Sequence, residues 1–141
     1  MNAIVLNTKT LSVTEYDWLF RSITANYAGD TLGLYRLGGD LDGVQPIASE
    51  IRTGLCAWGD SHKKRIPSAY LSMSGVGAGV FSVQTRETQF DFPFEMRSVA
   101  RVLLGKGIIS NYLSFGFKNT AGADFSLDKI EPQFIAATRR I

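Results

Sequence analysis

Glycine-rich turns cut the chain into short apolar segments, and few folds accommodate that spacing. The turns read AGDTLG (28–33), LGGDLDG (37–43), SGVGAG (74–79), LGKG (104–107) and NTAGAD (119–124). Many of the segments between them alternate apolar and polar residues with a period of two, which is typical of strands that bury one face. We therefore predict an all-β fold, mainly an antiparallel β-sandwich or jelly-roll, with at most one short N-terminal helix.

The segment TQFDFPFEM (88–96) shows the alternation most clearly. Phe90, Phe92, Phe94 and Met96 fall on one face of a strand, and the intervening residues point the other way. Burial of four such side chains contributes about 6–12 kcal/mol of transfer free energy, before the cost of ordering the chain. The proline between them has no N–H to donate to a neighbouring strand, so the segment is predicted to lie at a sheet edge or to contain a bulge.

A hairpin is predicted in the middle of the chain. AYLSM (69–73) and GVFSVQT (79–85) each place apolar residues on one face. The glycines of 75–79 can adopt the positive φ angles that tight hairpin turns use. Further strands are predicted at 32–37, 47–58, 112–117 and 124–135.

The one helix that the sequence favours lies in VTEYDWLFRSITANYAG (13–29). Thr14 could cap it, with Asp17 three residues later as the partner in a loose capping box. Leu19 and Ile23 would share a face, and a glycine follows as a stop signal.

Length and composition favour one folded domain. The chain has 141 residues, of which 45% are hydrophobic and 20% are charged, as is ordinary for a globular protein. No internal repeat or linker divides it. We predict a single β-rich domain over residues 1–141, with residues 1–30 as a candidate arm or helix that contacts neighbouring molecules.

Several classes of site and location are disfavoured. The single cysteine excludes an internal disulfide and a zinc site built from several cysteines of one chain. The apolar segments are shorter than a membrane span, and the opening MNAIVLN lacks the basic region of a signal peptide. We expect no membrane insertion and synthesis in a reducing compartment.

The stretch GLCAWGDSHKKRIPSAY (54–70) holds the only cysteine and the only histidine, Cys56 and His62. A nucleophilic cysteine needs a nearby base, but no feature of the sequence brings these two side chains together. A lone cysteine in an apolar strand usually packs as a small hydrophobic residue. We predict no catalytic residue, no metal site and no cofactor, and hence a protein that is not an enzyme.

Three bases in a row, Lys63, Lys64 and Arg65, follow the histidine. A solvated loop is the first interpretation, a contact with an acidic neighbouring subunit is the second, and phosphate binding is the third. The bases are isolated rather than spread along a groove with interleaved aromatic residues, so nucleic acid is not expected as a partner. Residues 1–62 carry 4 basic and 7 acidic residues, whereas residues 63–141 carry 11 and 6, and this asymmetry can favour head-to-tail packing of copies or arise by chance.

Exposed aromatic residues can stack on sugars or anchor an interface. Trp58, Tyr35 and Tyr70 are the candidates for ligand stacking, and Trp58 is also a candidate subunit contact beside the three bases.

Residues 32–141 resemble virion structural proteins of tailed bacteriophages, of the tail or baseplate type. The similar stretches are LYRLGGDLDGVQPIASEIRTGLCAWGDSHKKRIPSAYLSMSG and GKGIISNYLSFGFKNTAGADFSLDKIEPQFIAATRRI. Their shared features are the Leu-Gly-Gly-Asp turn, the Trp-Gly-x-Ser and Lys-Lys run, the Gly-Lys-Gly turn and the terminal Arg-Arg. These are turn-and-strand patterns rather than catalytic signatures.

The resemblance implies a tail-tip or baseplate protein that assembles in multiple copies with other tail proteins. Its location would be the virion tail, after synthesis in the cytoplasm of the host bacterium, and a host-surface receptor would be a further partner. Two alternatives stay open: a receptor- or carbohydrate-binding tail module, and a capsid decoration protein.

Overall fold

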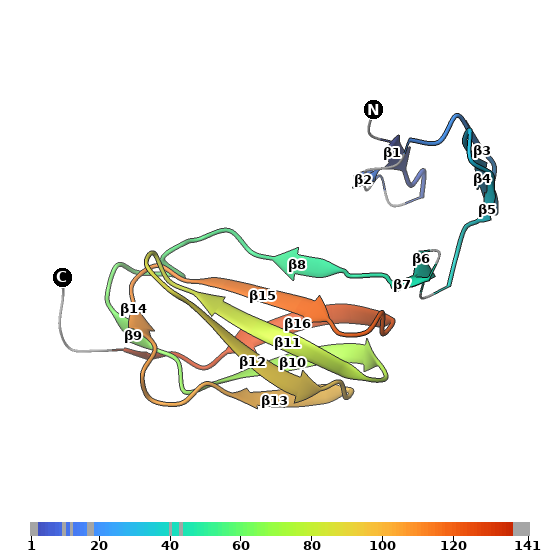
Figure 1. The fold of residues 1–141 in the computed structure, drawn as a ribbon. Helices are drawn as coiled ribbons and strands as arrows, with labels where there is room; N and C mark the ends of the chain where they lie inside the picture. Colours follow the sequence, from blue (N-terminus) through green and yellow to red (C-terminus); the bar gives the residue numbers. More distant parts are fainter. Residues whose placement is uncertain are drawn as a thin grey trace. The chain divides into compact units, whose positions relative to one another are not determined.

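The computed structural model describes residues 3–9, 11, 13–16, 19–39, 41–42 and 44–136 (Figure 1). These residues form strands, turns and loops but no helix, and their strand pairings are antiparallel. The prediction of an all-β fold is confirmed. The chain divides into two compact units, Met1–Gly39 and Asp40–Ile141, called here the N-terminal and the C-terminal unit.

The N-terminal unit consists of very short strands. β1 (Ala3–Leu6) pairs with β2 (Val13–Tyr16). β3 (Ser22–Ile23), β4 (Tyr27–Gly29) and β5 (Leu34–Arg36) form a second sheet in that order. Side chains close the turns of this second sheet: the Asp30 carboxylate accepts hydrogen bonds from the backbone N–H groups of Leu32 and Gly33, at 2.6 and 2.9 Å.

The helix predicted over 13–29 is wrong, because described residues of that range form β2, β3 and β4. The expected helix needed a core against which Leu19 and Ile23 could pack, and these side chains are 69% and 54% exposed. The β-branched residues of the segment also favour extended backbone, and Thr24 closes a turn by donating from its hydroxyl to the Tyr27 carbonyl. Asp17 lies outside the described residues.

Two sheets pack face to face in the C-terminal unit (Figure 1). The first has the order β12-β11-β15-β8, made by Gln89–Glu95, Ala78–Gln84, Ser114–Asn119 and Glu50–Arg52. The second has the order β13-β10-β16, made by Val99–Leu103, Ser68–Gly75 and Phe125–Pro132. This arrangement is a β-sandwich.

Two smaller elements flank the sandwich. β14 (Ile109–Ser110), β9 (Lys64–Arg65) and β17 (Ile135–Ala136) form a short sheet with β9 in the centre. β6 (Leu41–Asp42) and β7 (Gln45–Pro46) form a hairpin near the start of the unit.

Aromatic side chains fill the space between the two sheets. Phe81, Phe115 and Phe117 are fully buried, and Leu71 faces them from β10. The rings of Phe81 and Phe115 stack, with 6.0 Å between their centroids. The phenylalanines of β12 pack against this core from one side, as the alternation in 88–96 predicts. β12 lies at the edge of its sheet, where its proline costs no ladder hydrogen bond.

The hairpin predicted between 69–73 and 79–85 is wrong. Both segments are strands, but β10 and β11 belong to different sheets, and the glycines between them carry the chain from one layer to the other. Gly75 and Gly77 have φ angles of 136° and 128°, which side-chain-bearing residues rarely adopt. A Cβ atom on Gly75 would also collide with the carbonyl oxygen of Asp124, so this crossing requires glycine there.

Candidate functional site

The loop that the sequence singles out, residues 57–65, is anchored by Trp58. The Trp58 indole N–H donates to the Leu113 carbonyl at 2.8 Å, and its ring lies edge-on to Phe115 with 5.1 Å between centroids. Trp58 has a φ of 47° and Gly59 a φ of 101°, so the chain turns sharply at this point. Trp58 thus ties the loop to the core of its own unit, and its roles in ligand stacking and subunit contact stay predictions.

Lys64 is buried inside the same loop. Its ammonium group is hydrogen-bonded to the carbonyl oxygens of Ala57, Asp60 and His62, at 3.0, 2.6 and 3.3 Å, and to the Asp60 carboxylate at 2.7 Å. Lys64 is only 6% exposed. The prediction of a solvated loop is wrong at this residue, because carbonyl groups of the turn converge on one point and need a donor there.

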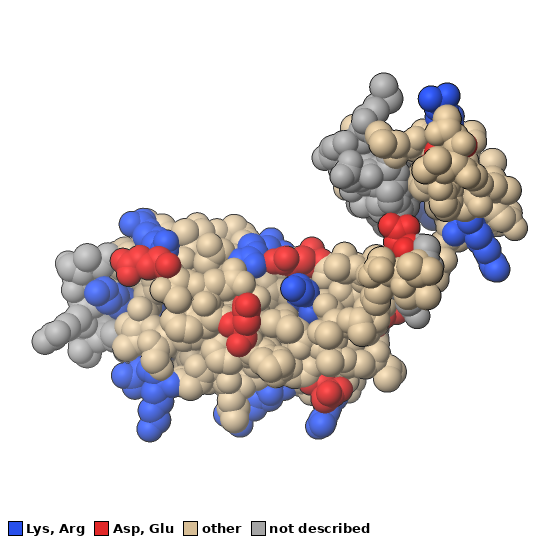
Figure 2. Space-filling model, viewed as in Figure 1, with Lys and Arg blue, Asp and Glu red and all other residues tan. Residues whose placement is uncertain are grey.

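The remaining two bases of the run are exposed, and they differ from Lys64 in what they can contact. Arg65 lies in β9 opposite Ile109 and Ile135. Of the three bases proposed for a subunit contact, only Lys63 and Arg65 are therefore accessible to a neighbour. Their role in such a contact stays a prediction. On the face shown in Figure 2, basic and acidic side chains are interspersed over the C-terminal unit rather than collected in one basic stripe.

The hydrogen bonds of the loop stabilise the charged form of Asp60. The hydrogen bond from Lys64 and a second from the backbone N–H of His62 lower the pKa of the Asp60 carboxyl from 3.8 to about 2. The His62 imidazole also approaches this carboxylate, with 3.4 Å between Nδ1 and Oδ1. The folded state therefore favours the ionised carboxylate more strongly than the unfolded chain does.

This shift sets the sign of a pH dependence. Because the folded pKa lies below the unfolded one, the contribution of Asp60 is present above pH 3.8 and is lost as the pH falls toward about 2. We expect the difference in unfolding free energy between the wild-type chain and Asp60→Asn to shrink over this interval. Urea unfolding followed by circular dichroism at several pH values measures this difference. A difference that stays constant over the interval would contradict the lowered pKa of Asp60.

The two tyrosine candidates lie on separate units. Tyr70 is half-buried in the middle of β10, opposite Arg101, whose guanidinium carbon lies 5.7 Å from the centre of the ring. The flanking residues of Tyr70 point into the core, so its ring faces outward. Tyr35 belongs to β5 of the N-terminal unit, is 39% exposed and lies 5.7 Å from the Phe20 ring. Trp58 packs against the core whereas the Tyr70 ring faces outward, so these two do not form one stacking platform.

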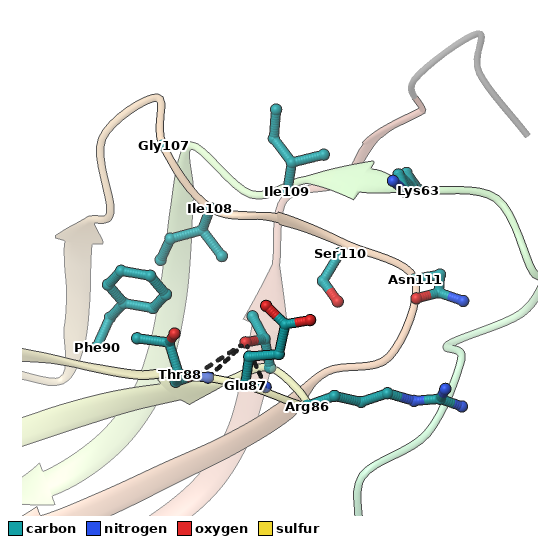
Figure 3. A pocket seen from close by; sticks show the side chains of 11 residues that line it. Lys63, Arg86, Glu87, Thr88, Phe90, Gly107, Ile108, Ile109, Ser110 and Asn111 are labelled. Carbon is teal, nitrogen blue, oxygen red and sulfur yellow. Dashed lines mark hydrogen bonds between the residues drawn. The ribbon is translucent and has the colours of Figure 1, made fainter. Parts of the chain in front are cut away.

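A pocket of about 340 Å³ lies where the β11–β12 turn meets the segment that precedes β15 (Figure 3). Phe90 and Ile108 form its apolar side, and Glu87, Ser110 and Asn111 supply polar groups. Sequence reasoning missed this pocket. Its lining comes from separate stretches around residues 63, 85–90 and 107–111, and no motif links them.

The N-terminal unit exposes most of its large apolar side chains. Among the side chains that the structure describes there, Ala28 is the one buried hydrophobic residue. The exposed ones lie between 39% and 87% accessible: Ile4, Leu6, Leu11, Val13, Leu19, Ile23, Tyr27, Leu32, Leu34 and Tyr35. Single exposed apolar residues are ordinary, but this many in a segment of 39 residues mark a surface that a partner can cover.

Cys56 and His62, the one cysteine and the one histidine of the chain, have different neighbours in the structure. The backbone of Cys56 is paired with Leu113, and the histidine lies beside Asp60. Within the described ranges, no three His, Cys, Asp or Glu side chains are placed to hold a metal ion. No helix among those residues is long and apolar enough to cross a membrane. The chain matches no protein-family model, no curated protein and no solved structure.

Proposed function

We propose that the chain is a non-enzymatic structural component of a bacteriophage virion, and that it acts at the tail tip or baseplate in multiple copies with other tail proteins. The resemblance of residues 32–141 to tail and baseplate proteins supports the virion role. The all-β fold of the C-terminal unit agrees with this role but is shared with many other functions.

The observation that carries the proposal is the uncovered apolar surface of the N-terminal unit. A segment of fewer than about 40 residues rarely folds alone without disulfides, metals or a partner, since it buries too little surface to offset its conformational entropy. This segment contains no cysteine, since the chain's single cysteine is Cys56. Among its described hydrophobic side chains it buries only Ala28. An assembly protein, whose segment is covered by neighbouring molecules, accounts for such a surface.

A receptor- or carbohydrate-binding tail module is the second candidate. The pocket beside the β11–β12 turn supports it, because an aromatic ring next to hydroxyl, amide and carboxylate groups suits a sugar. This role is compatible with a place in the tail, whereas the third reading, capsid decoration, requires a place on the head.

The composition of purified particles tests the proposal. Phage particles that encode this chain are banded on a density gradient and analysed by quantitative mass spectrometry against a major capsid protein of known copy number. We expect the chain in the particles at several copies each, in a fixed ratio. Its absence from particles, with abundance in the infected cell, would overturn the virion role and favour an intracellular one.

A further inference from the structure

Hydrogen bonds hold both walls of the pocket between the β11–β12 turn and the segment before β15. The Thr85 hydroxyl donates to the Thr88 carbonyl at 3.0 Å. It accepts hydrogen bonds from the backbone N–H groups of Glu87 and Thr88, at 3.3 and 3.0 Å. On the opposite wall the Ser110 hydroxyl donates to the Tyr112 carbonyl at 2.9 Å. Because the walls are fixed in this way, a ligand would bind without paying to order them.

A cation–π contact joins the two walls. The guanidinium carbon of Arg86, in the turn, lies 3.9 Å from the centre of the Tyr112 ring. A guanidinium over an aromatic face is attracted by the charge distribution of the ring. In Figure 3 the Arg86 side chain extends away from Phe90, so its charge lies at the rim of the pocket. Arg86 thus holds the turn against the segment before β15.

Polar groups that are free to bind a ligand line the pocket beside an apolar wall. Within the part of the chain that the structure describes, three of its side chains have no hydrogen-bond or ion-pair partner: Lys63, Glu87 and Asn111. They offer an ammonium donor, a carboxylate acceptor and an amide that both donates and accepts. Figure 3 shows the Glu87 carboxylate rising from the turn into the pocket, with Phe90 and Ile108 on the apolar side. A sugar presents the matching surfaces, since its hydroxyl groups form hydrogen bonds and its C–H face packs on apolar groups.

The size and charge of the pocket narrow the class of sugar. Its volume of about 340 Å³ lies near the lower end of the range for small-molecule sites, about 300–1,000 Å³, and suits one ring rather than a long chain. A site for a charged ligand presents an excess of the opposite charge to it. Here Lys63 and Glu87 carry opposite charges, and the Arg86 guanidinium lies over an aromatic ring. Hydrogen bonding to hydroxyl groups, rather than charge, therefore selects the ligand.

We infer that the pocket binds one ring of an uncharged pyranose sugar. The hydroxyl groups of the ring bind Glu87 and Asn111, and one C–H face of the ring packs against Phe90. The inference deepens the second candidate function, the carbohydrate-binding module, and rests on that candidate rather than on assembly with other tail proteins.

Saturation-transfer difference NMR on the full-length chain tests this inference. The probes are the methyl glycosides of glucose, galactose, mannose and N-acetylglucosamine, each titrated to 50 mM as an experimental ceiling of roughly ten times the expected dissociation constant. We expect at least one of them to give a saturable signal with a dissociation constant of about 1–10 mM, as is usual for so small a ligand. The methyl glycosides of glucuronic acid and glucosamine are the charged comparisons, and we expect neither to bind more than about fivefold tighter than its neutral counterpart.

Variants of the two binding groups locate the site. We expect Glu87→Ala to weaken binding of the sugar at least about tenfold, because hydrogen bonds to a charged acceptor are lost. Glu95→Ala is the matched control, since Glu95 is also exposed and lies at the end of β12 far from the turn. Asn111→Ala is a second variant that leaves the turn unchanged, and circular dichroism checks that each variant is folded.

The remaining outcomes each decide the question. Absence of signal from all four neutral glycosides would overturn the inference. A charged glycoside that binds more than about fivefold tighter than its neutral counterpart would assign the pocket to a charged ligand instead. Equal binding by Glu87→Ala, Asn111→Ala and Glu95→Ala would place the sugar elsewhere on the chain. None of these results changes the expected presence of the chain in purified particles, so failure of the sugar site and failure of the virion role are distinguishable.

Discussion

Phe115→Ala is expected to lower the unfolding free energy of the C-terminal unit by about 3–5 kcal/mol, the cost of a large cavity in a closely packed core. Phe115 is fully buried, stacks with Phe81 and contacts the edge of Trp58. Its removal leaves a gap between the sheets that neither neighbouring ring can fill without leaving its own position. Urea unfolding followed by circular dichroism measures the loss.

Phe134→Ala is the matched control for this change. Phe134 belongs to the same aromatic cluster, with its centroid 6.3 Å from that of Phe115, but it is 37% exposed. We expect a clearly smaller loss of stability for this variant, because water already reaches the site. A cost below about 1 kcal/mol for Phe115→Ala would contradict the packing of the sandwich described above.

Lys64→Met is expected to destabilise the same unit by about 1–3 kcal/mol, since several carbonyl groups of the loop would lose their shared donor. Methionine matches the length of the lysine stem but cannot donate a hydrogen bond. The neighbouring Lys63→Met should change stability by no more than about 0.5 kcal/mol, because Lys63 is exposed. Both substitutions remove one positive charge. A difference in stability between the two variants therefore measures the effect of the buried hydrogen-bond donor alone.

Equal effects of the two substitutions would contradict the assignment of Lys64 as the donor that closes the loop. The comparison also bears on any test of subunit contact at Lys63, Lys64 and Arg65. Replacing all three bases would unfold the loop as well as remove charge, so only Lys63 and Arg65 report on contacts with a neighbour.

The sandwich could be predicted from the sequence where apolar residues alternate with other residues along a strand. In 88–96 three phenylalanines alternate with other residues, and of the two outcomes that the proline at position 93 predicts, an edge or a bulge, the structure shows the edge. A period of two determines which side chains point inward, but it carries no information on which strand pairs with which. For this reason 69–73 and 79–85 are strands as predicted, while the hairpin between them is not formed.

The candidate site was less predictable, because its defining contacts depend on loop geometry. Nothing in the sequence HKKR distinguishes Lys64 from Lys63, and the difference arises only when the carbonyls of Ala57, Asp60 and His62 converge. The helix predicted over 13–29 is absent for a different reason, which concerns the surroundings of the segment. Its apolar spacing suits a helix that packs on a core, and the N-terminal unit provides no such core among its described residues.

The proposed function makes the chain a virion protein, and antibody-gold labelling of intact particles from the source that encodes it tests this claim most directly. Antibodies raised against the full-length chain are applied to purified virions and to particles of an unrelated phage as the control. The proposed function leads us to expect gold at the distal end of the tail. Gold over the head would move the protein to the class of capsid decoration proteins, and the absence of specific gold from virions that carry accessible tails would contradict a structural role there.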